Sequence, residues 1–80
     1  MLDQNQVLEC IASALEVDGE LINENTKMHD LEEWDSFGHL NILMALDAKL
    51  VGKAASISSL SGAFSVKEII SVLRKHDLVS

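Results

Sequence analysis

Two helix-start signals of the same kind, one near each end of the chain, most constrain its fold. Asp3 and Gln6 have the spacing of a capping box, in which side chains satisfy free N–H groups of the first helical turn, and Ser65 and Glu68 repeat it. Apolar residues follow each signal at the i, i+3, i+4, i+7 spacing of a one-sided helix: Leu8, Ile11, Ala12 and Leu15, then Val66, Ile69, Ile70 and Leu73. The sequence therefore predicts an amphipathic helix near each end, the first over residues 4–17.

The most apolar segment, residues 36–50, lies between these two helices. Its apolar residues cover more than one side of a helix: Phe37, Leu40, Ile42, Leu43, Met44, Ala45, Leu46 and Leu50. Such a helix is expected at the centre of a bundle, with neighbours on several sides. The polar segment 18–34 is expected to form a long loop, and the serine-rich segment 51–63 a loop with one short helical turn near residues 58–63.

Length and composition restrict the chain to one small domain. Eighty residues with 48% hydrophobic content and no proline favour a single helical domain over residues 1–80. We therefore predict an all-α fold, a small bundle of three main helices plus one short helix, with a long first loop. No apolar run reaches the ~20 residues that span a bilayer, and no secretion signal is evident, so we expect a cytoplasmic protein with no membrane partner. The single cysteine, Cys10, fits a reducing compartment and a place in the core.

Charge divides unevenly along the chain. Residues 1–47 carry eleven acids and one base, a net charge of −10, whereas residues 48–80 carry five bases and two acids, a net charge of +3, and the total is −7. An acidic front half would repel nucleic acid and steer a basic protein partner toward it. Solubility alone is the alternative explanation of the same charge. We expect a monomer.

Ser36 stands out because it begins the 36–50 helix, which has no capping box. If Asp35 is the N-cap, its carboxylate accepts from a backbone N–H near residues 37 or 38, and Ser36 is the first helical residue with a free, solvent-facing hydroxyl. A phosphate on that hydroxyl would meet unpaired N–H groups and the positive end of the helix dipole. The alternative is that Ser36 is itself the cap and has only a structural role.

The residues around Ser36 form a pattern that is found elsewhere. Asp30-Leu31 is followed by Asp35-Ser36-Phe37 and by an apolar run over residues 40–46 that ends in Met44-Ala45-Leu46. This pattern resembles that of acyl carrier proteins, and the resemblance extends over nearly the whole chain through its length, acidity, long first loop, central helix and final helix. It implies that the chain is not an enzyme but carries acyl groups as thioesters on a covalent 4′-phosphopantetheine arm.

The resemblance also implies partners and site residues. A phosphopantetheinyl transferase would attach the arm to Ser36 from coenzyme A with Mg²⁺, while Asp35 would cap the helix and help this enzyme dock. An acyl-loading ligase, synthase or acyltransferase with a basic patch would be the second kind of partner. Candidates for lining an acyl pocket are Leu40, Ile42, Leu43, Met44, Leu46 and Ile69, each equally well explained as ordinary core.

Two departures from the family pattern indicate a specialised carrier. Phe37 replaces the leucine that usually follows the serine, and the 36–50 helix carries one acid, Asp47, where fatty-acid carriers have several. The acids lie upstream instead, which would change partner choice and association rate. We expect a specialised lipid, saccharide-modification or secondary-metabolite pathway, and a partner surface formed by Asp30, Glu32, Glu33, Trp34, Phe37, His39, Asn41 and Asp47. Trp34 has a second interpretation, in which it packs the loop against the helix.

Other classes of function have weaker support in the sequence. A small acidic helical interaction module, or a degenerate carrier that is never modified, would share the fold and the charge but would have no cofactor. Ser36 and His39 lack the orienting acid and oxyanion hole of a hydrolase. The three histidines, at positions 29, 39 and 76, lack metal-ligand spacing. A peptidyl carrier would usually have glycines ahead of the serine, where this chain has Glu33-Trp34-Asp35.

Overall fold

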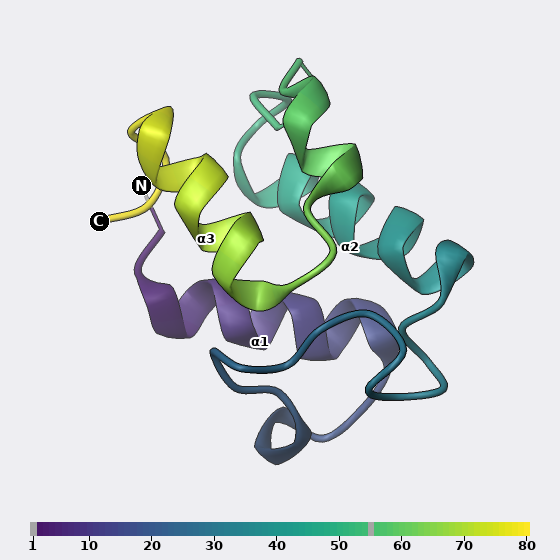
Figure 1. The fold of residues 1–80 in the computed structure, drawn as a ribbon. Helices are drawn as coiled ribbons and strands as arrows, with labels where there is room; N and C mark the ends of the chain where they lie inside the picture. Colours follow the sequence, from purple (N-terminus) through teal and green to yellow (C-terminus); the bar gives the residue numbers. More distant parts are fainter. Residues whose placement is uncertain (1, 55) are drawn as a thin grey trace.

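The computed structural model describes residues 2–54 and 56–80, and in these ranges the regular secondary structure is entirely helical. Three α-helices, α1 (Gln4–Leu15), α2 (Ser36–Lys49) and α3 (Val66–Lys75), are joined by segments that contain two short 3-10 helices, η1 (Gly19–Leu21) and η2 (Ser58–Gly62) (Figure 1). The predicted all-α bundle, with one short helical turn near residues 58–63 and a long first loop, is therefore confirmed. None of the described helices has the length and apolar character needed to cross a membrane.

Hydrogen bonds between near neighbours set both ends of α1. The Asp3 carboxylate accepts from the Gln6 N–H at 2.8 Å and the Gln6 side chain accepts from the Asp3 N–H at 2.9 Å, so the predicted capping box is complete. The helix ends at residue 15 because Glu16 takes a left-handed conformation (φ 57°) and its N–H returns to the Ser13 carbonyl at 3.1 Å. The helix therefore ends earlier than the predicted boundary at residue 17.

The core is organised around α1 rather than α2. The α1 helix lies against α2, η1 and α3, whereas α2 lies against α1 and η2 and completely buries Ile42 and Leu46. The prediction that α2 is the central helix of the bundle is therefore wrong, although it does pack against α1, η2 and the end of the loop that precedes it. No described residue covers the outer side of α2, where the side chains of Phe37, Leu40 and Met44 are 80%, 52% and 61% exposed.

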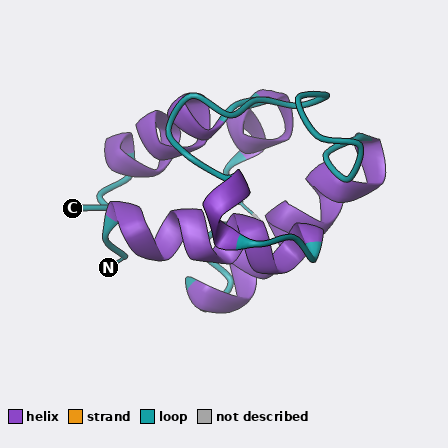
Figure 2. Cartoon of the chain, turned by 90° about the horizontal axis from the view of Figure 1, so that it is seen from below, coloured by secondary structure: helices purple, strands orange, loops and turns teal. Residues whose placement is uncertain are grey.

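The long loop between α1 and α2 is fastened to the bundle at two places. The Met28 N–H donates to the Phe64 carbonyl at 2.8 Å and the Val66 N–H donates to the Thr26 carbonyl at 2.9 Å, which joins the middle of the loop to the start of α3. The end of the loop is held by Trp34, whose side chain is completely buried. Figure 2 shows the loop crossing one side of the helices. These attachments bring the acidic residues of the loop next to the start of α2.

The last helix and the two chain ends complete the bundle. The Ser65 hydroxyl accepts from the Glu68 N–H at 3.1 Å, so α3 begins at the predicted cap. The N- and C-terminal segments lie side by side (Figure 1), because the Leu2 N–H donates to the Leu78 carbonyl at 3.1 Å and the Ser80 N–H donates to the Leu2 carbonyl at 3.0 Å. These bonds lie at the ends of α1 and α3, away from Ser36.

Candidate functional site

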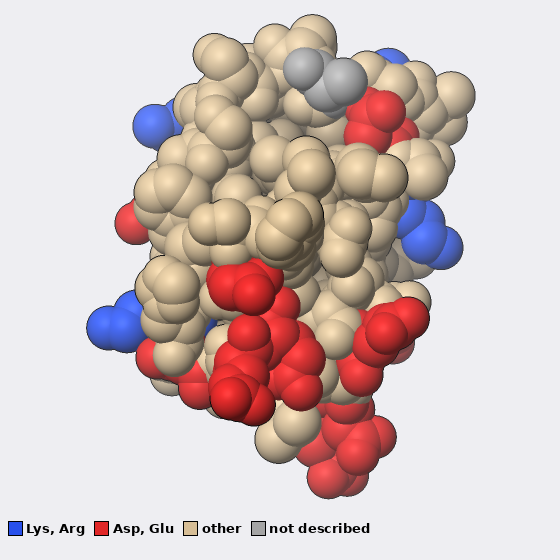
Figure 3. Space-filling model, turned by 90° about the vertical axis from the view of Figure 1, so that its right-hand side faces the viewer, with Lys and Arg blue, Asp and Glu red and all other residues tan. Residues whose placement is uncertain are grey.

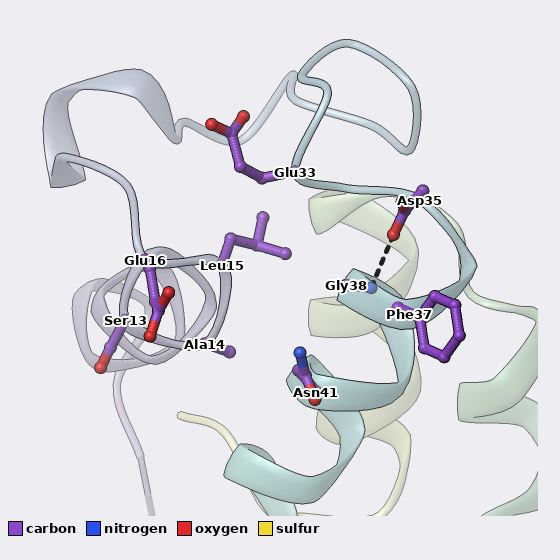
Figure 4. Close-up of a pocket in the computed structure, with 9 residues that line it drawn as sticks. All are labelled: Ser13, Ala14, Leu15, Glu16, Glu33, Asp35, Phe37, Gly38 and Asn41. Atoms are coloured by element: carbon purple, nitrogen blue, oxygen red, sulfur yellow. Dashed lines mark hydrogen bonds between the residues drawn. The ribbon is translucent and has the colours of Figure 1, made fainter.

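Ser36 is the first residue of α2, and Asp35 is the residue that caps this helix. Asp35 Oδ1 accepts from the Gly38 N–H at 2.9 Å, the bond drawn in Figure 4, and the Asp35 carbonyl accepts from the His39 N–H at 2.8 Å. The sequence-based assignment of Asp35 as the N-cap is confirmed. The alternative, in which Ser36 is itself the cap, is wrong.

This arrangement leaves the Ser36 hydroxyl and N–H without a hydrogen-bond partner among the described residues. Its side chain is exposed, and within the described residues no hydrogen bond uses the Ser36 hydroxyl or the backbone N–H groups of Ser36 and Phe37. Free N–H groups and the helix dipole make such a helix start favourable for a phosphate. A phosphodiester on Ser36 Oγ would meet two free donors, and its formation would break no existing hydrogen bond. The site therefore fits a phosphate-linked arm.

Gly38 lies where the loop backbone packs directly on the first turn of α2. A Cβ atom at this position would collide with the Glu33 carbonyl oxygen, and it would lie 2.8 Å from Leu15 Cδ2 and 3.1 Å from the Glu33 carbonyl carbon. Glycine has no Cβ, so three segments can meet at this point: α1, α2 and the part of the connecting loop over residues 30–35, which we call the acidic loop. This contact sets where the acidic loop lies relative to Ser36.

A cleft of about 470 Å³ opens beside this contact, between the end of α1 and the start of α2. Figure 4 shows its lining: Ser13, Ala14, Leu15, Glu16, Glu33, Asp35, Phe37, Gly38 and Asn41. The carboxylates of Glu16 and Glu33 form no ion pair with any residue in the described part of the chain. The cleft therefore presents negative charge beside the exposed ring of Phe37. Sequence reasoning missed Ser13 and Glu16, since no local pattern connects the end of α1 with Ser36.

Most of the residues predicted to form a partner surface are accessible to solvent. Asp30, Glu32, Glu33, Phe37 and Asn41 are exposed, and Asp47 is partly exposed. In the view of Figure 3, acidic side chains gather on one part of the molecular surface, next to a larger area without charge. A protein that docks near Ser36 would meet these exposed acids together with the exposed apolar side chain of Phe37.

Trp34 and His39, which were also expected on the partner surface, lie in the core instead. Trp34 is 0% exposed and His39 is 5% exposed. The Trp34 indole N–H donates to His39 Nδ1 at 3.2 Å, and the two rings are nearly parallel, with an interplanar angle of 10° and their centroids 6.3 Å apart. Placing these residues on the surface is wrong, and the second interpretation of Trp34, as a packing residue, is confirmed. A polar ring can be buried here because both of its nitrogens find partners inside the protein.

A second cavity, of about 240 Å³, lies between α2 and η2. Leu43 and Met44 line it from α2, and Ala54, Ile57 and Leu60 line it from the segment that leads into and through η2. The other residues considered for an acyl pocket lie elsewhere: Leu40 is on the exposed side of α2, and Ile42, Leu46 and Ile69 are fully buried in the core. Leu43 and Met44 are therefore the candidates that border an open cavity.

Cys10 is a core residue, as predicted from its position beside the apolar face of α1. Burial raises the pKa of the Cys10 thiol above its ordinary value, and the nearby Lys49 ammonium acts in the opposite direction to a smaller extent. The thiol therefore stays protonated near neutral pH and is a poor nucleophile. No group of three or more potential metal-ligating side chains is found among the described residues.

No family model, no curated protein and no solved structure matches this chain. The function must therefore be inferred from Ser36 and from the surfaces beside it.

Proposed function

We propose that the protein is an acyl carrier that holds acyl groups as thioesters on a 4′-phosphopantetheine arm attached to Ser36. The observation that carries this proposal is made at the start of α2: Asp35 caps the helix, and the exposed Ser36 hydroxyl forms no hydrogen bond with any described residue. A serine kept only for helix stability would occupy the cap position itself. The resemblance of residues 30–46 to acyl carrier proteins supports the same function.

In this proposal Ser36 supplies the acceptor oxygen and a separate phosphopantetheinyl transferase supplies the catalysis. Ser36 Oγ attacks the pyrophosphate of coenzyme A with Mg²⁺ bound, so that a new P–O bond forms as the pyrophosphate bond breaks. Adenosine 3′,5′-bisphosphate leaves, and the hydroxyl proton passes to the transferase. The free N–H groups of Ser36 and Phe37 stabilise the phosphodiester that results. When attached, the arm supplies a terminal thiol for thioester formation.

The surfaces near Ser36 support a protein partner that combines a basic patch with an apolar contact. Exposed acids at Asp30, Glu32 and Glu33 precede the site, and the exposed Phe37 ring lies beside it. Exposed charges of this kind increase the association rate and select partners more than they add affinity. Because α2 carries a single acid, Asp47, we infer a specialised lipid, saccharide-modification or secondary-metabolite pathway rather than bulk fatty-acid synthesis.

A small interaction module without a cofactor is the second candidate function. The observation that favours it is the exposed apolar row on α2, formed by Phe37, Leu40 and Met44 at the i, i+3, i+7 spacing of one helix side. Exposed apolar surface bordered by charge is typical of protein-binding sites. A carrier would use the same row for its enzymes, so modification of Ser36 is what separates the two candidates.

Intact mass measurement tests the proposal directly. The protein is incubated with coenzyme A, Mg²⁺ and a broad-specificity phosphopantetheinyl transferase, and the mass is compared before and after. We expect one phosphopantetheine on the wild-type chain and none on Ser36→Ala. A folded wild-type protein that gains no mass would favour the interaction module.

Ser65→Ala is the matched control, since the Ser65 hydroxyl is a true helix cap. Loss of that hydroxyl should lower the free energy of unfolding by about 1 kcal/mol and leave the mass gain intact. Ser36→Ala should show the reverse, with unchanged stability and no mass gain. Equal losses of stability in the two variants would instead assign Ser36 a structural role.

A further inference from the structure

The buried ring of His39 is held by hydrogen bonds at both of its nitrogens. The Trp34 indole N–H donates to Nδ1 at 3.2 Å, and Nε2 lies 3.1 Å from the Leu60 carbonyl oxygen. An indole nitrogen can only donate and a carbonyl oxygen can only accept, so Nδ1 must be the acceptor and Nε2 must carry the proton. The partners therefore select a neutral imidazole in a single tautomer.

These two bonds join three segments of the chain. Trp34 belongs to the acidic loop, His39 to the first turns of α2, and Leu60 to η2, 21 residues further along the chain. A ring contact adds to the hydrogen bonds, since the centroid of the imidazole lies 5.1 Å from that of the Phe64 ring. We name the Trp34 indole, the His39 ring and the Leu60 carbonyl together the His39 bridge.

One end of the His39 bridge lies next to the turn that carries Ser36, and the other end lies at the cavity between α2 and η2. At one end, Trp34 directly precedes the cap residue Asp35, whose carbonyl accepts from the His39 N–H at 2.8 Å in the turn that carries Ser36. At the other end, Leu60 lines the cavity of about 240 Å³ between α2 and η2. The bridge is thus a direct link between the turn at Ser36 and a wall of this cavity.

We propose that His39 is a positioning residue that couples η2 to the Ser36 site, so that η2 and the end of the acidic loop open together. Displacement of η2 leaves the buried Nε2–H of His39 without an acceptor. A buried N–H without a hydrogen bond is unfavourable in free energy, so the ring turns until this N–H finds another acceptor. When the ring turns, Nδ1 leaves the Trp34 indole, and the loop beside the Asp35 cap is released. On the proposed carrier function, a molecule that enters the cavity and moves η2 would alter the site at Ser36.

Hydrogen exchange of the Trp34 indole N–H measures this coupling, and the chain has only one tryptophan, so its NMR signal is unique. The perturbation is Ile57→Ala, because the Ile57 side chain is buried beside η2 and lines the cavity. The matched control is Ile70→Ala, a buried isoleucine on α3 that does not line it. The two variants are compared under conditions in which they have lost the same free energy of unfolding. We expect indole exchange to be at least about fivefold faster in Ile57→Ala than in Ile70→Ala. This is the factor expected when one buried hydrogen bond is lost.

The same perturbation is then repeated in two backgrounds that each keep half of the bridge. In His39→Asn the amide oxygen takes the place of Nδ1 as acceptor for Trp34, and no donor reaches Leu60. In His39→Gln the amide nitrogen takes the place of Nε2 as donor to Leu60, and Trp34 loses its acceptor. In either background we expect Ile57→Ala to change the rate of indole exchange by less than about twofold, once the change due to lower global stability has been subtracted. One folded background is enough for the comparison.

Two results would overturn the proposal. The first is equal indole exchange in Ile57→Ala and Ile70→Ala at matched stability, which would mean that η2 and the loop open only with global unfolding. The second is an Ile57→Ala effect that persists in full in a His39 variant, which would mean that another path carries the coupling. All exchange measurements use the unmodified chain, so their outcome is independent of whether Ser36 accepts phosphopantetheine.

Discussion

Replacing Gly38 by alanine should destabilise the protein, although alanine is the better helix former. In an unobstructed helix the change would be favourable by about 1 kcal/mol. Here the added methyl group would collide with the Glu33 carbonyl oxygen and lie 2.8 Å from Leu15 Cδ2. A backbone carbonyl cannot rotate away as a side chain can, so either the acidic loop or the start of α2 has to move.

The expected magnitude combines two unfavourable effects with this favourable one. Overpacking at a tight site costs about 1–3 kcal/mol. A shift of Glu33 also displaces Asp35, whose 2.9 Å bond to the Gly38 N–H contributes about 1 kcal/mol as a helix cap. After the gain in helix propensity, the free energy of unfolding should fall by about 1–3 kcal/mol, and the melting temperature by roughly 4–8 °C per kcal/mol in a domain of this size.

Urea unfolding followed by Trp34 fluorescence measures this change, because the chain's single tryptophan is fully buried next to the cap. Gly19→Ala and Gly62→Ala are matched controls, since a Cβ at either position would meet no atom within 4 Å. These controls should stay within about 0.5 kcal/mol of the wild type or become slightly more stable. A Gly38→Ala protein that is as stable as the two controls would refute the packing argument.

Three further predictions concern the cap, the acidic loop and the core thiol. Asp35→Ala should lower the free energy of unfolding by about 1 kcal/mol in the same titration, and an unchanged value would contradict its role as the N-cap. Reversing Glu32 and Glu33 to lysine should slow loading by the transferase at low salt and have less effect at high salt; equal low-salt rates would exclude electrostatic steering. Because burial raises the pKa of the Cys10 thiol, the unfolded chain loses this proton first as the pH rises above the ordinary value of 9.0. The free energy of unfolding should therefore fall above that pH, and it should fall less in Cys10→Ala, the control that lacks the thiol.

The sequence by itself indicated the three helix starts and favoured Asp35 as the N-cap of α2. Each N-cap joins a side chain to a backbone N–H three residues later, as between Asp35 and Gly38, so the signal and its partner lie in the same short segment. The apolar periodicity of α1 and α3 likewise specifies the buried side of each helix. Interactions this local can be recognised before the rest of the chain is placed.

Only the tertiary structure decided which side chains are covered and which surfaces come together. Trp34 and His39 are buried because the Leu60 carbonyl, 21 residues beyond His39, completes their hydrogen bonds in the core. Leu40 is 52% exposed because no described segment lies over that side of α2, although its apolar character made it a candidate for lining an acyl pocket. The physical reason is the same in each case: burial depends on contacts between segments distant in sequence, and no periodicity within one segment reports where its neighbours will lie.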